Sequence, residues 1–285
     1  MERNVYLLRV AKVFGLFPFE IINNDIKTST KLKILNIGII LALIASAILI
    51  CRDYYIIGER PLSEIGTIVE TCFGFCSAAG ATLMLIKTSA ISKNFHKIVK
   101  LTEEASVFLK EDKKFKRNYI AIASFTFECC SEIYFILFRS FSENPYRPWS
   151  FSVDIPYMIV RYYDILLTIV VMLFISGLNN LIKMINKKLK SLKESFYKKD
   201  LIIDLRILHE DAADLLKENH NCFQLFNLLN ISTSAACLIY TMFHFLKDEN
   251  FKFWEEAYWF SYWGGKVVAL VLVCAETMYE VTMIL

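Results

Sequence analysis

Residues 32–51 read LKILNIGIILALIASAILIC, a stretch in which Lys33 is the one charged side chain. A helix rises 1.5 Å per residue, so these residues extend about 30 Å, the thickness of the hydrocarbon core of a bilayer. Similar apolar stretches follow between charged segments, at about 65–86, 119–138, 158–182, 223–246 and 257–276. A soluble helical protein would need a core able to bury all six. We therefore predict an all-α, polytopic membrane bundle of six transmembrane helices.

The composition agrees with a membrane protein. Hydrophobic residues make up 55% of the 285 residues and the mean hydropathy is +0.42, whereas soluble domains contain roughly 45–50% apolar residues. The net charge of +3 reflects topology, because the basic residues are not gathered into an aromatic-interleaved patch of the kind that binds nucleic acid. We expect the lipid bilayer, and no nucleic acid, as a partner.

The distribution of lysine and arginine predicts the orientation. Segments 1–31, 87–118 and 183–222 together contain 23 of these residues, while the other three connections together contain 6. Basic residues are retained on the cytoplasmic side of a membrane. We therefore expect a plasma-membrane protein with a cytoplasmic N-terminus and little extracellular mass.

This orientation divides the chain into four parts. Residues 1–31 form a cytoplasmic segment, and residues 32–182 contain the first four spans with the cytoplasmic connection 87–118. Residues 183–222 form a cytoplasmic helical anchor, and residues 223–285 contain the last two spans and a short tail.

The anchor carries a helical pattern of apolar residues. Steps of four and three residues connect Leu201, Leu205, Leu208, Ala212 and Leu215. This heptad spacing keeps one stripe on one face of a helix. The run continues into the fifth span without Pro or Gly, so we predict one long helix packed in a cytoplasmic bundle with the continuation of the fourth. The alternative is an amphipathic, lysine-rich segment lying on the anionic inner leaflet.

Ionisable residues inside the spans are the clearest functional signal. Glu128 and Glu132 in the third span lie four residues apart and share a helix face. Two such charges cost on the order of 5 kcal/mol, against about 4 kcal/mol returned by the apolar residues of the span. The two glutamates should therefore face other helices or a water-filled cavity.

With the predicted orientation, polar and aromatic side chains gather in the outer halves of several spans. Aromatic walls with a few charges suit a pocket that opens outward and binds a small molecule. The candidate ligand-binding residues are Glu132, Arg161, Tyr162, Asp164, His244, Tyr262, Trp263 and Lys266. The alternatives are an interfacial aromatic belt with a snorkelling Arg161, and a Lys266–Glu132 or Lys266–Asp164 ion pair that only holds helices together.

Patterns typical of enzymes and metal sites are absent from the sequence. His209-Glu210-Asp211-Ala212-Ala213 lacks the second histidine of a zinc HExxH site, and there is no GxGxxG, P-loop or GxSxG pattern. We expect no catalytic activity, cofactor or metal.

Two stretches resemble insect gustatory receptors. One is Arg9-Val10-Ala11-Lys12-Val13-Phe14-Gly15-Leu16-Phe17-Pro18-Phe19 before the first span, and the other runs from Leu205 through His209-Glu210-Asp211 to Phe223. The span lengths and the predicted inside N-terminus are similar as well. The related insect odorant receptors share this architecture and are the alternative within the resemblance.

The resemblance implies a ligand-gated cation channel that binds tastants in an outward-facing transmembrane pocket. It also implies a homo- or hetero-tetramer with related subunits, held by the cytoplasmic helices. The family's Thr-Tyr…Gln-Phe motif, with five residues between its two pairs, lies in a seventh, pore-lining helix. This sequence ends at Leu285 without it, so we expect the pore helix to be missing. The runner-up function is a small secondary transporter with Glu128, Glu132 and Lys266 as a charge relay.

Overall fold

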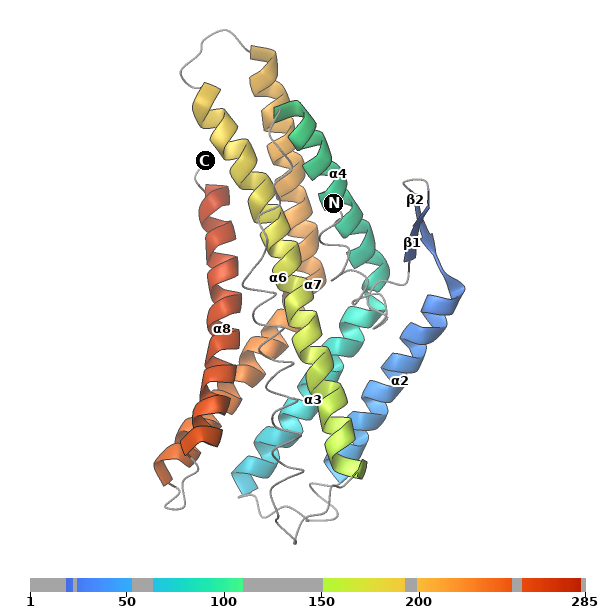
Figure 1. The fold of residues 1–285 in the computed structure, drawn as a ribbon, viewed down its shortest axis with the longest axis vertical. Helices are drawn as coiled ribbons and strands as arrows, with labels where there is room; N and C mark the ends of the chain where they lie inside the picture. The colour runs from blue at the N-terminus through green and yellow to red at the C-terminus, as the bar shows by residue number, and fades with distance from the viewer. Residues whose placement is uncertain are drawn as a thin grey trace.

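Six helices and a short β-hairpin make up the part of the chain that the computed structural model describes, residues 19–22, 25–52, 64–109, 151–192, 199–247 and 253–282 (Figure 1). The hairpin pairs β1 (Phe19–Ile22) with β2 (Asp25–Thr28). The helices are α2 (Thr30–Arg52), α3 (Glu64–Ile86), α4 (Thr88–Leu109), α6 (Phe151–Leu192), α7 (Lys199–Lys247) and α8 (Phe253–Thr282).

The helices cover five of the six predicted spans. The third, 119–138, lies outside the described residues. Three described helical segments are long and apolar enough to cross a membrane: Thr30–Arg52, Met158–Lys190 and Ile203–Phe243. A fourth is added if α3 and α4, which are bent against each other, count as one broken span. The chain is thus a polytopic helical membrane protein.

The long helix α6 lies at the centre of the bundle. It contacts α2, α3, α4, α7 and α8, and Figure 1 shows it running along most of the molecule. Val160, Leu167, Phe174 and Leu178 are at most 2% exposed and belong to the main core. Apolar residues of α6 therefore face neighbours all along the helix, which is why it is buried on most sides.

A second, smaller core joins α4, α6 and α7 at the lysine-rich end of α6. Ala105, Ile185, Leu205 and Ala212 are fully buried there. Leu208 is partly buried and packs against them, and Leu215 lies in the main core. The side chain of Leu201 lies outside the described residues. Residues 183–192 of α6 and 199–222 of α7 thus pack as a helical bundle with α4, and α7 is a single helix of 49 residues.

The axes of α3 and α4 differ by 64° across Lys87, at a point without proline or glycine. Sharp bends without these residues arise where a side chain interrupts the backbone hydrogen bonds of the helix. Here the Thr88 hydroxyl donates to the carbonyl of Leu85. Asn36 of α2 donates through Nδ2 to that carbonyl at 3.3 Å and to the Thr88 hydroxyl at 3.4 Å. The bend is therefore held by hydrogen bonds from side chains.

The same bend is joined to α7. The Lys87 ammonium donates to the backbone carbonyls of Asn221, at 3.1 Å, and of Cys222, at 3.5 Å. About two turns further along α4, Asn94 donates to the Oδ1 of Asn219 at 3.4 Å. Polar contacts thus connect α2, α3, α4 and α7 at one level of the bundle.

The β-hairpin was not among the sequence predictions. Its strands pair antiparallel, from Phe19 opposite Thr28 to Ile22 opposite Asp25. A four-residue strand has too few alternating positions to stand out beside the long helical patterns.

Candidate functional site

The candidate site begins on one face of α6. Arg161, Asp164 and Thr168 are spaced three and four residues apart, which places them on the same side of a helix. They are 3%, 1% and 4% exposed, respectively. A carboxylate and a guanidinium in such surroundings require partners from neighbouring helices.

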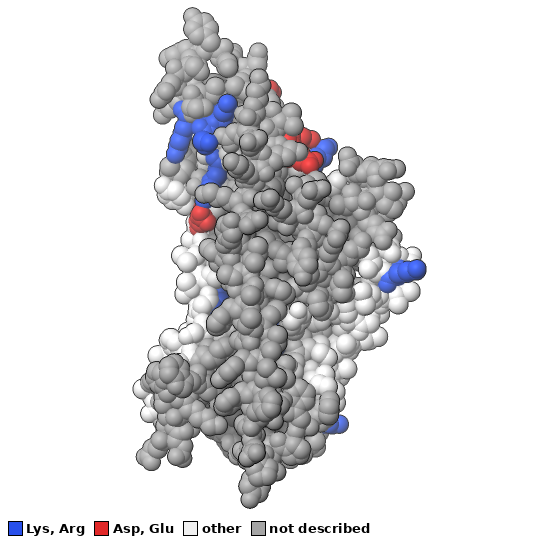
Figure 2. Space-filling model, in the orientation of Figure 1, with Lys and Arg blue, Asp and Glu red and all other residues white. Residues whose placement is uncertain are grey.

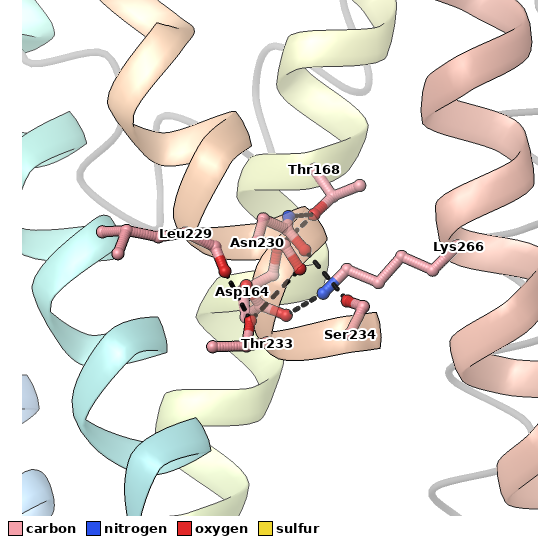
Figure 3. A network of polar contacts seen from close by, with 7 residues as sticks. All are labelled: Asp164, Thr168, Leu229, Asn230, Thr233, Ser234 and Lys266. Carbon is pink, nitrogen blue, oxygen red and sulfur yellow. Dashed lines mark hydrogen bonds and ion pairs between the residues drawn. The ribbon is translucent and has the colours of Figure 1, made fainter. Parts of the chain in front are cut away.

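Lys266 of α8 supplies the partner of Asp164. Its ammonium group forms an ion pair with the carboxylate Oδ2 (Figure 3). The side chains are 7% and 2% exposed, so the pair is almost entirely removed from solvent. An ion pair in a low-dielectric interior is strong, and separating its members is costly.

Hydrogen bonds extend this pair to α7. The Thr168 hydroxyl donates to the backbone carbonyl of Asp164 at 2.8 Å and accepts from the Nδ2 of Asn230 at 2.6 Å. Ser234 donates to the Oδ1 of Asn230 at 3.4 Å, and Thr233 donates to the carbonyl of Leu229 at 2.7 Å. Figure 3 shows these residues converging on one point between α6, α7 and α8.

Aromatic rings border the polar groups. The Arg161 guanidinium carbon lies 4.4 Å from the ring centroid of Trp259 and 4.8 Å from that of Tyr262. The Lys266 ammonium lies 5.6 Å from the ring of Trp263. These distances allow cation–π attraction, which is strongest where water is excluded. Both cations therefore rest against aromatic faces of α8.

The aromatic group continues to α3. Trp263 meets Phe73 edge to face at 5.0 Å and Tyr262 at 4.6 Å between ring centroids. Phe73, Tyr262 and Trp263 are at most 3% exposed and form a separate buried cluster. Such a set combines apolar surface with a few fixed polar groups, the combination that small-molecule sites use.

Five of the eight candidate residues come together: Arg161, Asp164, Tyr262, Trp263 and Lys266. Of the two ion pairs considered, Lys266–Asp164 is present. Tyr162 is half-buried on α6 beside Arg161. His244 belongs to α7, but its side chain lies outside the described residues, as does the whole of Glu132.

Sequence reasoning missed the α7 side of the site. Asn230 and Ser234 lie four residues apart within the polar run Asn230-Ile231-Ser232-Thr233-Ser234, a spacing that signals a shared polar face. Trp259, which contacts Arg161, was not among the candidate residues either. Gly264 and Gly265 of α8 do not mark a close helix contact among the described residues. A Cβ at Gly264 would meet Leu238 at an ordinary 3.8 Å, and one at Gly265 would meet no described atom within 4 Å.

The site also lacks the usual ligands of a metal centre among the described residues. Within the described ranges, no three His, Cys, Asp or Glu side chains are grouped so as to hold a metal ion. The polar groups of the site are an amide, hydroxyls, the Arg161 guanidinium and the Lys266–Asp164 ion pair, and these suit hydrogen bonding to an organic molecule.

A match to one known protein family covers almost the whole chain. Residues 6–282 match the sequence model of a family described as 7tm Chemosensory receptor. No curated protein matches the chain.

Proposed function

The chain belongs to the 7tm chemosensory receptor family, the family of the insect gustatory receptors, and on this premise we propose that it is a gustatory-type subunit that binds a small tastant between α6, α7 and α8. The observation that carries the proposal is the buried Lys266–Asp164 pair with aromatic rings around it. The family is one of receptors and not of enzymes. Family membership also favours a receptor over the transporter considered from the sequence.

The binding mode follows from the chemistry of the cluster. Tyr262 and Trp263 offer apolar ring faces, while Asp164 and Asn230 offer acceptors and a donor for hydrogen bonds. The cluster is filled by its own side chains, since Arg161, Tyr262 and Trp263 are each 3% exposed. A ligand therefore gains access by displacing rings or the Arg161 side chain, and that displacement is the first movement of the receptor.

The predicted topology sets the direction of access. The excess of basic residues in segments 1–31, 87–118 and 183–222 supports a cytoplasmic N-terminus, six spans and a site that opens outward from the plasma membrane. The lysine-rich C-terminal end of α6 and the contacts between α4 and α7 then lie on the cytoplasmic side. A tag at the N-terminus should be accessible to antibody only after the cells are permeabilised.

The proposed output is a ligand-gated cation current from a tetramer with related subunits. The unbroken helix α7 supports the proposed coupling between ligand binding and current. Asn230 in the site and Leu205 in the smaller core lie 25 positions apart on this helix, or about 38 Å measured along it. A displacement of α7 at the site is thus carried to the helices that would join subunits.

The test is a ligand-evoked current or calcium signal from the full chain co-expressed with related receptor subunits, screened against sugars, amino acids and alkaloids. Trp263→Ala should shift the concentration dependence of the response at unchanged surface expression. Phe260→Ala is the matched control, since Phe260 lies on the same helix and is 46% exposed. Equal responses from wild type and Trp263→Ala would exclude the cluster as the site.

A further inference from the structure

A lysine stripe lies along the last turns of α6. Lys183, Lys187 and Lys190 follow at intervals of four and three residues, which places them on one face. Lys187 and Lys190 are exposed, while the opposite face buries Ile182 and Ile185 in the smaller core. Figure 2 shows basic side chains gathered on the visible face at the upper end of the molecule, over the end of α6.

The end of α8 lies beside this stripe. Lys183 forms an ion pair with Glu276 of α8, and both helices run in the same direction (Figure 1). Lys187 and Tyr279 therefore both lie one turn beyond that pair. Met278 and Tyr279 are 62% and 60% exposed, so this end of α8 presents an apolar and an aromatic side chain near the lysines.

Below them, one side of α8 is an exposed apolar stripe. Val268, Val271 and Leu272 are 55%, 50% and 62% exposed and recur with helical spacing up to Met278. The surface thus changes along the molecule from an apolar stripe to a tyrosine and then to lysines. Tyrosine is enriched at the boundary between hydrocarbon and water.

The order matches the layers of one membrane leaflet. The fourth span was predicted to end at residue 182, so Lys183 and Lys187 lie about 1.5 and 7.5 Å past the hydrocarbon. The headgroup region of one leaflet is about 5–7.5 Å thick. Lysine clusters directly beyond a span attract anionic lipid. We infer that the seam between the ends of α6 and α8 binds an anionic phospholipid, with its headgroup on Lys187 and Lys190 and its acyl chains along α8.

Native mass spectrometry of the purified full chain tests this site. The probes are phosphatidylserine, phosphatidylcholine with the same acyl chains, and glycerophosphoserine, which carries the headgroup without the chains. Phosphatidylserine should remain bound in preference to phosphatidylcholine, and glycerophosphoserine should not displace it. The measurement does not depend on the orientation of the chain or on tastant binding, so its result is separate from that of the proposed function.

The decisive variant is Lys187→Gln/Lys190→Gln. Each lysine near a membrane surface contributes about 1 kcal/mol, so affinity for phosphatidylserine should fall roughly thirty-fold. Lys93→Gln/Lys100→Gln removes the same charge from exposed positions on α4 and should leave the affinity unchanged. If the double variant does not survive purification, Lys190→Gln alone should weaken binding about fivefold.

Several results would overturn the inference. Equal binding of the two lipids, an equal loss in the α4 control, or displacement by glycerophosphoserine each removes a required part of the site. Cross-linking of two copies through α8 in place of bound lipid would assign the apolar stripe to an interface between subunits.

Discussion

Lys266 and Asp164 lie 102 residues apart in the sequence and form an ion pair with side chains 7% and 2% exposed. The pair joins α8 to α6 at the point where α7 contributes Asn230. Its surroundings combine a hydrogen-bonding amide with aromatic rings, so these residues hold the helices together and also form the ligand site that we propose. Substitutions at this point separate the two roles.

Breaking the ion pair should destabilise the fold. Asp164→Asn or Lys266→Met leaves one buried charge without its partner, which costs about 3–5 kcal/mol. The double variant Asp164→Asn/Lys266→Met removes both charges and should recover most of that loss. The melting temperatures of the four proteins in detergent measure the effect. A double variant less stable than either single variant would show that the charges themselves are required for folding.

The Asn230 amide should contribute a smaller amount. Asn230→Ala removes the 2.6 Å bond to Thr168 and the bond from Ser234. Hydrogen bonds between transmembrane helices contribute about 0.6 kcal/mol on average and up to about 1.7 kcal/mol. The Asn230→Ala change should lower the free energy of unfolding in mixed micelles by an amount within this range.

Asn227→Ala is the control for that variant. Asn227 lies about one turn earlier on α7, and its Oδ1 has no hydrogen-bond partner among the described residues. The change at Asn227 should have the smaller effect. A larger loss at Asn227 than at Asn230 would contradict the hydrogen-bond network.

Close packing between α3 and α7 depends on Gly80. A Cβ at this position would lie 3.2 Å from Cδ2 of Phe226 and 4.0 Å from Cδ1 of Leu229. Gly80→Val should therefore overpack the contact and cost about 1–3 kcal/mol. Gly38→Ala is the control, since no atom of the described residues lies within 4 Å of a Cβ there. Thermal unfolding of both variants distinguishes a packing glycine from one that faces open space.

The bend between α3 and α4 should show coupling between Asn36 and Thr88. The single variants Asn36→Ala and Thr88→Val, together with the double variant, form a thermodynamic cycle. Residues in one hydrogen-bond network show interaction energies of about 0.5–3 kcal/mol, so the two losses should not add. Additive losses would mean that the Asn36–Thr88 contact does not hold the bend.

The helices that cover five of the six predicted spans were accessible from the sequence, because runs of about twenty apolar residues have few alternatives to a long helix. The long α7 was also predicted, since its heptad stripe runs from Leu205 into the fifth span without Pro or Gly. The boundary at Lys87 followed from the change from apolar to charged residues. These features depend on local composition and period.

The partner of Lys266 could not be chosen from the sequence. Depth along a helix can be counted, but the rotation of α6 relative to α8 decides whether Lys266 meets Asp164 or Glu132. Asn230 was missed for the same reason, because its role depends on Thr168 of another helix. The hairpin was missed because its strands are too short to show a period.

A proline fixes a bend through the covalent chain, whereas the bend at Lys87 depends on hydrogen bonds from side chains. Its 64° angle is accompanied by donors that belong to α2 and to Thr88, and Lys87 itself donates to backbone carbonyls of α7. Each of these bonds contributes about 1 kcal/mol. The direction of α4 is therefore a tertiary property of the bundle, fixed by α2 and α7 together with the local sequence.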